Sequence, residues 1–102
     1  MASNLFSVRI TSAAESDLLG GFRFYQKQQE GLGHYFIDSL YSDIDSLCFL
    51  AGTNLQTYKQ LHRALAKRFP YAIYYKFDQQ IVYVVAVLDC RQRPASIRQR
   101  LL

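Results

Sequence analysis

Five side chains in the second half of the chain have the chemical character that metal-free cleavage of RNA requires. Such cleavage needs a base to activate the ribose 2′-hydroxyl, cations to stabilise the crowded phosphate, and an acid to protonate the leaving oxygen. A lone histidine is more often a structural residue, so these residue types allow this chemistry without requiring it. The candidate residues for the three roles are His62, Arg63, Lys67, Tyr75 and Arg91.

A second group of cations gathers toward the end of the chain. Residues 1–58 carry three Lys or Arg against six Asp or Glu, whereas residues 59–102 carry nine against two. This asymmetry favours an anionic partner, either nucleic acid or an acidic protein segment, although scattered cations also serve solubility alone. Arginine suits bidentate contacts with phosphate or carboxylate. The candidate residues for binding a target or a partner protein are Lys67, Arg68, Arg91, Arg93, Arg98 and Arg100.

The other groups that bind metals are widely separated in the sequence. His34, His62, Cys48 and Cys90 lack the spacing of a ligand pair, so we expect no metal site and no cofactor. Two cysteines make no disulfide framework and suit a reducing compartment. No signal segment is visible, and the longest apolar stretch, residues 81–88, is too short to span a bilayer. We therefore expect a cytoplasmic protein that does not associate with membranes.

Hydrophobic periodicity indicates the elements that would position these residues. Apolar and polar residues alternate before Thr11, which predicts a first strand. Residues 12–15 read as a capping box, with Ser12 as the N-cap of a helix whose apolar positions recur at helical spacing. Residues 30–33 interrupt this pattern, and a second apolar stripe from Phe36 to Ala51 predicts another helix. The two helices should pack as an antiparallel hairpin.

The remainder of the chain is typical of a sheet. Residues 58–66 predict a short strand, and residues 72–77 and 81–88 predict a β-hairpin. The last run is apolar throughout, so we expect a central strand that is buried on both faces, and we expect Tyr74 to be an exposed ring. The order β-α-α-β-β-β predicts a single α+β domain over residues 1–102, with a helical hairpin packed on a mainly antiparallel sheet.

Three segments at this spacing resemble the RelE/ParE toxin superfamily. The first is the strand that leads into the helix start at residues 13–18. The second, residues 67–75, reads K-R-F-P-Y-A-I-Y-Y, and the third, residues 84–94, reads V-V-A-V-L-D-C-R-Q-R-P. The second and third segments are the specific part of the resemblance, which extends over nearly the whole chain.

The resemblance implies the toxin half of a type II toxin–antitoxin pair, a plasmid stabilisation system protein that a cognate ParD-like antitoxin neutralises in a hetero-oligomer. RelE-like members cut mRNA on the ribosome, whereas ParE-like members inhibit DNA gyrase and cut no RNA. Here Ala72 lies at about the point where the mRNA cutters have an arginine, and the tail after Pro94 has neither tyrosine nor histidine. These departures favour the ParE branch, with no catalytic residues. One alternative is a metal-independent endoribonuclease that uses some set of the five candidate residues named first, and a weaker one is a member that binds its antitoxin but has lost its toxicity.

Overall fold

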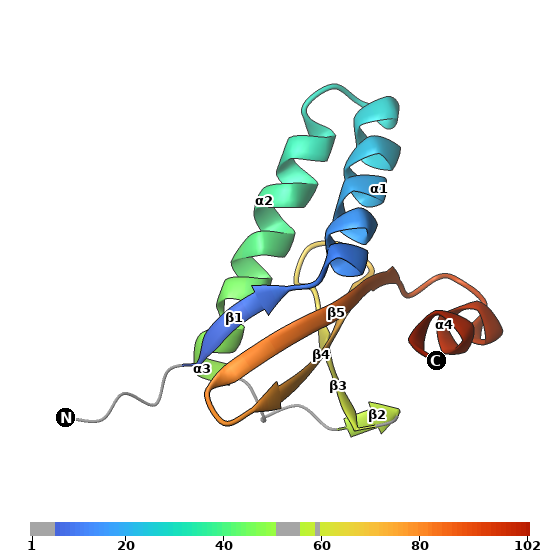
Figure 1. Ribbon diagram of the computed structural model, residues 1–102. Coiled ribbons are helices and arrows are strands. Elements are labelled where there is room, and N and C mark those ends of the chain that lie inside the picture. The colour runs from blue at the N-terminus through green and yellow to red at the C-terminus, as the bar shows by residue number, and fades with distance from the viewer. Residues whose placement is uncertain (1–5, 51–55, 59) are drawn as a thin grey trace.

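The computed structural model describes residues 6–50, 56–58 and 60–102. Five strands form one sheet in the order β1-β5-β4-β3-β2 (Figure 1). Their bounds are β1 (Ser7–Ile10), β2 (Gln56–Tyr58), β3 (Leu61–Leu65), β4 (Tyr71–Asp78) and β5 (Ile81–Asp89). The strand β1 pairs with β5 in parallel, and every other pair is antiparallel. The predicted α+β class and the mainly antiparallel sheet are thereby confirmed.

The helices occupy both faces of this sheet. The long pair stands on one face as an antiparallel hairpin, and the last helix packs on the opposite face, next to the end of β5 (Figure 1). The bounds of the helices are α1 (Ser12–Gln28), α2 (Leu32–Asp45), α3 (Leu47–Leu50) and α4 (Pro94–Leu101). None of the described helices is both long and apolar enough to cross a membrane.

The helical hairpin is fixed at its start and at its turn. The N-cap of α1 is Thr11, whose side chain accepts a hydrogen bond from the Ala14 backbone N–H, so the prediction of a cap at Ser12 was wrong by one residue. Between the helices, Gly31 takes a φ of +90°, a conformation that glycine adopts without steric cost. The two helices also pack closely at Gly21 of α1, where a Cβ would lie 2.4 Å from the Phe36 ring of α2.

The main core lies between this hairpin and the sheet. It joins Leu18 of α1 and Phe36 of α2 to Tyr75 and Val84 of the two central strands, and all four are at most 1 % exposed. Each such side chain contributes roughly 1.5–3 kcal/mol through burial. The core therefore holds β4 and β5 rigidly against the hairpin, which sets where the residues at the strand ends point.

A second, smaller core fills the opposite face of the sheet. Ile97 and Leu101 of α4 pack against the buried cluster of Ala72, Tyr74, Ala86 and Leu88. Tyr74 is only 4 % exposed, so the prediction of an exposed ring was wrong, because α4 covers this part of the face. The same helix explains why the β5 run is apolar: residues 86–88 are buried on both faces, while Tyr83 and Val85 are only partly buried.

The strand predicted over residues 58–66 is found as β3, while Tyr58 at its start belongs to a separate strand, β2. The strands β2 and β3 pair antiparallel across a tight turn, and Gln60 in this turn has a φ of +67°. As a result, β2 rather than β3 forms the outer edge of the sheet.

Candidate functional site

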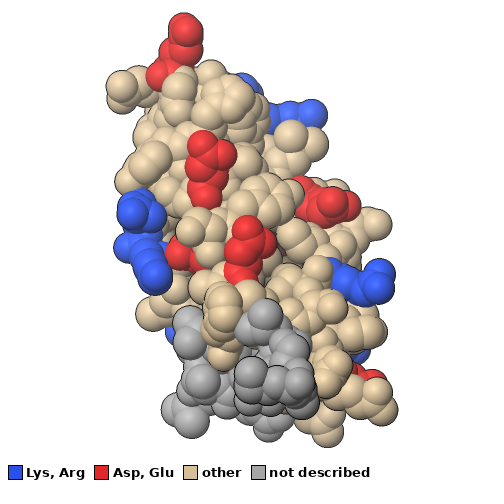
Figure 2. Space-filling view, turned by 90° about the vertical axis from the view of Figure 1, so that its left-hand side faces the viewer, with Lys and Arg blue, Asp and Glu red and all other residues tan. Residues whose placement is uncertain are grey.

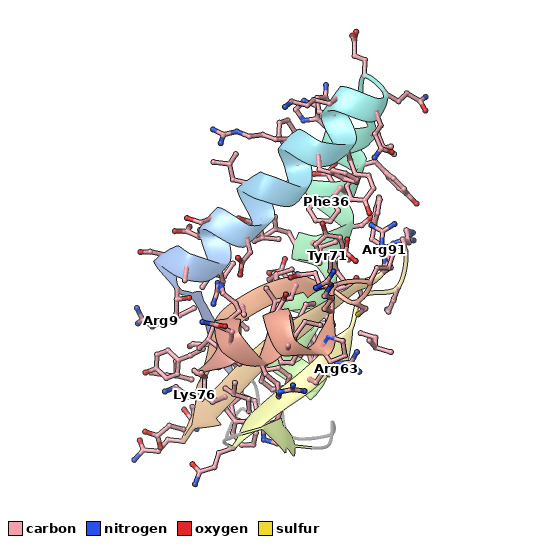
Figure 3. All side chains as sticks on the ribbon, turned by 90° about the vertical axis from the view of Figure 1, so that its right-hand side faces the viewer. Arg9, Phe36, Arg63, Tyr71, Lys76 and Arg91 are labelled. Carbon is pink, nitrogen blue, oxygen red and sulfur yellow. The ribbon has the colours of Figure 1, made fainter. Side chains whose placement is uncertain are left out.

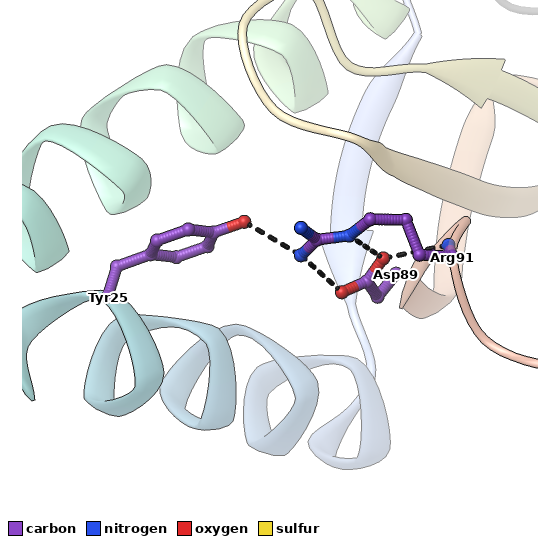
Figure 4. A network of polar contacts seen from close by, with 3 residues as sticks. All are labelled: Tyr25, Asp89 and Arg91. Atoms are coloured by element: carbon purple, nitrogen blue, oxygen red, sulfur yellow. Dashed lines mark hydrogen bonds and ion pairs between the residues drawn. The ribbon is translucent and has the colours of Figure 1, made fainter. Parts of the chain in front are cut away.

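The geometry of the candidate site begins at the end of β5, where an arginine is held between a carboxylate and a tyrosine (Figure 4). Arg91 donates from Nε and Nη2 to the two carboxylate oxygens of Asp89, at 2.9 and 2.7 Å. Nη2 also donates to the Tyr25 hydroxyl of α1 at 3.3 Å. The hydrogen bonds from Arg91 lower the pKa of Asp89, and Asp89 in turn raises the pKa of Arg91.

These contacts hold the Arg91 side chain in place and leave it accessible to solvent. Its side chain is 56 % exposed, and its Nη1 has no hydrogen-bond partner among the residues that the structure describes. A fixed, solvent-facing guanidinium is suited to binding an anion such as phosphate or carboxylate. Beside it, burial and the neighbouring Tyr25 and Asp89 raise the pKa of Tyr71 to about 12, so the Tyr71 hydroxyl keeps its proton to a higher pH than an ordinary tyrosine.

The five residues proposed for RNA cleavage do not come together in one cleft. Tyr75 is fully buried on the side of the sheet that faces the hairpin. His62 stacks on Tyr75, with their ring centroids 5.3 Å apart, and therefore lies on that same side. Arg63, the next residue on β3, faces the opposite side, where its Nε donates to the Tyr74 hydroxyl at 3.3 Å. That hydrogen bond is the main cause of the raised pKa of Arg63.

The remaining two members of that set, Lys67 and Arg91, lie in loops beyond the ends of the strands. Lys67 is exposed in the loop between β3 and β4, where its backbone N–H donates to the buried carboxylate of Asp43 at 3.0 Å. Arg91 lies in the network with Tyr25 and Asp89. His62 and Tyr75 are in contact through their stacked rings, but Tyr75 is fully buried and Arg63 lies on the opposite face of the sheet.

Of the residues proposed for binding a target or a partner protein, all but one are exposed. Lys67 and Arg68 lie in the loop before β4, while Arg93 and Arg98 lie at the start and on the solvent side of α4. Arg100 differs, because its Nη2 lies 2.6 Å from Asp17 of α1 and donates to the Ala13 carbonyl at 3.3 Å. Arg100 therefore attaches α4 to α1.

Asp17 is the important residue that the sequence reasoning missed. It lies near the start of α1, where a negative charge favours the helix dipole, and its Oδ2 also accepts from the Val87 backbone N–H at 3.0 Å. One carboxylate thus links α1, β5 and α4. No local pattern could have revealed this role, because its partners are 70 and 83 residues away in the sequence.

Two hollows accompany these residues. One of about 620 Å³ lies where α4 meets α1, and the Asp17–Arg100 pair lines it together with Leu88, Gln92, Ser96 and Gln99. An apolar one of about 360 Å³ lies between α1 and α2, with Leu19, Phe22, Ile37 and Tyr41 among its lining residues. Within the described ranges, no group of three or more His, Cys, Asp or Glu side chains could hold a metal ion.

The acidic and the basic side chains, which are unevenly distributed along the sequence, also lie on different surfaces of the molecule. Figure 2 shows Asp and Glu spread across the face that lies at the left of Figure 1, where α2 runs, with Lys and Arg mostly near the margins of that face. The exposed cations of the second half lie instead on the loop before β4 and on α4. The basic surface is thus formed by the sheet end and α4, and the hairpin contributes most of the acids.

Comparison with solved structures identifies the architecture. A chain of the chromosomal ParDE TA system from P. aeruginosa superposes with a TM-score of 0.76, covering 83 % of this chain and 96 % of that one at 12 % sequence identity. The chain has the RelE/ParE toxin fold. A chain of the toxin–antitoxin complex RelBE2 from Mycobacterium tuberculosis also matches, with a TM-score of 0.47, 20 % identity, and coverage of 81 % of this chain and 95 % of that one. No family model matches the chain, and no curated protein matches it significantly.

Proposed function

We propose that this chain is the toxin of a type II toxin–antitoxin pair and that it is ParE-like, a single-domain inhibitor of DNA gyrase in the cytoplasm. The observation that carries the proposal is the match over 96 % of a chain from a ParDE system. A cognate ParD-like antitoxin is the expected partner, in a hetero-oligomer. The fold supports a toxin of this superfamily, and the choice of target rests on the geometry of the side chains.

The distribution of the candidate catalytic residues supports the gyrase branch. A ribonuclease needs its base, acid and cations around one phosphate. Here Tyr75 is inaccessible in the core, and His62 and Arg63 lie on opposite faces of the sheet. Ala72, which takes the place of an expected arginine, is 1 % exposed beneath α4 and offers no cation there.

The surface proposed to contact the target is formed by the exposed cations around α4 and the neighbouring loop. Arg91 is held ready by Asp89 and Tyr25, and Arg93 and Arg98 project from α4. Lys67 and Arg68 extend the same charge from the loop before β4. A protein-binding toxin requires such a surface to be complementary to its target, and it requires no acid–base pair.

The antitoxin is proposed to bind in part over the apolar hollow between α1 and α2. Leu19 and Tyr41 line this hollow and are 46 % and 36 % exposed, so apolar surface is available there for an amphipathic segment. Elsewhere on the hairpin Phe24 and Tyr35 are about half exposed, and they pack against Tyr25 and Phe69 rather than in this hollow. Covering such side chains would also stabilise a domain of this small size.

The test is induced expression in bacteria with two readouts from the same cells: integrity of transcripts, and SOS induction with gyrase-linked DNA breaks. We expect DNA damage with intact transcripts. The double variant R93Q/R98Q should lose the damage, whereas R23Q/K27Q, which removes the same charge from the exposed side of α1, should retain it. Prompt transcript cleavage before any DNA damage would favour the ribonuclease alternative instead.

A further inference from the structure

One row of side chains on the sheet has no role in the proposed contact with gyrase. The strand registers place Arg9 of β1 and Lys76 of β4 on either side of Tyr83 of β5, since both are Cα partners of Tyr83. All three face away from the helical hairpin, because their neighbours Val8, Val82 and Tyr75 pack into the hairpin core. The row therefore crosses three adjacent strands on the outer face of the sheet.

The row is accessible and carries uncompensated charge. Arg9 and Lys76 are exposed, and Tyr83 is partly buried. Neither cation has an ion-pair partner within the part of the chain that the structure describes. Figure 3 shows Arg9 and Lys76 together on one side of α4, in the view that also shows Arg63. The buried cluster under α4 is formed by other residues, among them Tyr74 and Ala86, so α4 does not cover Tyr83.

We propose that the row of Arg9, Tyr83 and Lys76 is a binding site for single-stranded nucleic acid, in which a base stacks on Tyr83 and the two cations contact the flanking phosphates. Adjacent strands are about 4.8 Å apart, so the two cations lie roughly 10 Å apart at their Cα atoms, with the ring between them. An aromatic ring between cations on an open sheet is the arrangement that single-strand binding surfaces use.

The direction of the row favours nucleic acid over an acidic protein segment. A peptide that adds to a sheet runs along an edge strand and bonds to its backbone. This row instead runs across the strands, and its central strand, β5, is already paired on both sides. A flexible strand of nucleotides needs no backbone pairing, and its bases offer flat faces to the ring. Asp78 follows Lys76 on the same face of β4 and should weaken the binding of any polyanion.

The test is fluorescence anisotropy of the purified protein with labelled oligodeoxythymidine and oligouridine of about 12 nucleotides, within the usual site sizes, and with a duplex for comparison. Removing two phosphate contacts in R9Q/K76Q should weaken single-strand binding by about 25-fold at about 0.1 M salt and reduce the salt slope by about 1.4. The control R23Q/K27Q has the same net charge and should bind much more tightly than R9Q/K76Q.

The aromatic residue and Asp78 supply independent readouts. Y83L should weaken binding by about fivefold or more, while Y83F, which keeps the ring, should stay within about twofold. D78N should tighten binding. Comparing the DNA and RNA arms tells which strand the site prefers.

The proposal would be overturned by equal losses in R9Q/K76Q and R23Q/K27Q, or by unchanged binding in Y83L. It would also be overturned by labelled polyglutamate binding as tightly as the oligonucleotides and losing affinity in R9Q/K76Q but not in Y83L. That result would assign the row to an acidic protein segment. The readout involves no gyrase, so this proposal and the proposed function can fail separately.

Discussion

Replacing Asp17 with alanine should destabilise the domain more than any change to its arginine partner. The carboxylate accepts from the N–H of Val87, which is 1 % exposed, and losing a buried hydrogen bond to a charged group costs about 1.5–3 kcal/mol. The ion pair with Arg100 involves side chains that are 33 % and 16 % exposed, so it contributes only about 0.5–1 kcal/mol. The expected total is about 2–4 kcal/mol, a large share of the stability of a small domain.

The assay is urea unfolding followed by far-ultraviolet circular dichroism, together with thermal melts. D17A should lower the melting temperature by roughly 8–30 °C, at about 4–8 °C per kcal/mol for a domain of this size. R100Q removes the ion pair but keeps the bond to Val87, so it should cost about 0.5–1 kcal/mol. D17N can still present an amide oxygen to Val87 and should fall between the two. If D17A were no more destabilising than R100Q, the bond between Asp17 and β5 would contribute nothing and the reasoning would be refuted.

Three further predictions concern the packing, the pH dependence and the candidate histidine. G21A should destabilise the domain by about 1–3 kcal/mol, because its Cβ would meet the Phe36 ring. G20A, whose Cβ would have nothing within 4 Å, should stabilise α1 by about 0.5–1 kcal/mol. Thermal melts of both variants check these predictions, and equal effects would contradict them. The pKa of Tyr71 is raised from 10.0 to about 12, so the unfolded state loses its proton first and stability should fall as pH rises from 10 to 12; urea midpoints at several pH values should show that Y71F lacks this part of the fall. H62Q should kill induced cells as wild type does, and a folded H62Q without toxicity would argue for a catalytic histidine.

The elements with strong local patterns could be predicted from the sequence. The two long helices and the hairpin of β4 and β5 follow from periodicity, because each has a continuous apolar face that must be buried. The exact helix start could not be fixed so well, since Thr11 and Ser12 are both good N-cap residues and only the backbone geometry shows that Thr11 has this role.

The last helix was missed for a different reason. The tail after Arg93 is short and rich in arginine, and it shows only two apolar residues, Ile97 and Leu101, that reach the sheet. Pro94 at the first helical turn was a usable signal for a helix start. Because α4 was not foreseen, the burial of Tyr74 and the covered state of Ala72 could not be foreseen either.

The candidate site was predictable in residue type and unpredictable in arrangement. Arg91 was singled out as a cation, but its contacts with Asp89 and Tyr25 join the end of β5 to α1 across 66 residues of sequence. The division of His62 and Arg63 between two faces follows from strand alternation once β3 is placed in the sheet. Which face is covered by which helix is a tertiary fact that no local pattern contains.

The most direct test of the central claim is a supercoiling assay in which the purified protein is titrated into purified gyrase and relaxed plasmid. The same protein concentrations are added in parallel to a translation extract, in which the integrity of the message is measured. We predict that the protein inhibits supercoiling and traps cleaved DNA at concentrations that leave the message in translating ribosomes intact, and that R93Q/R98Q loses this inhibition while R23Q/K27Q keeps it. Unaffected gyrase together with message cut on the ribosome would contradict the account.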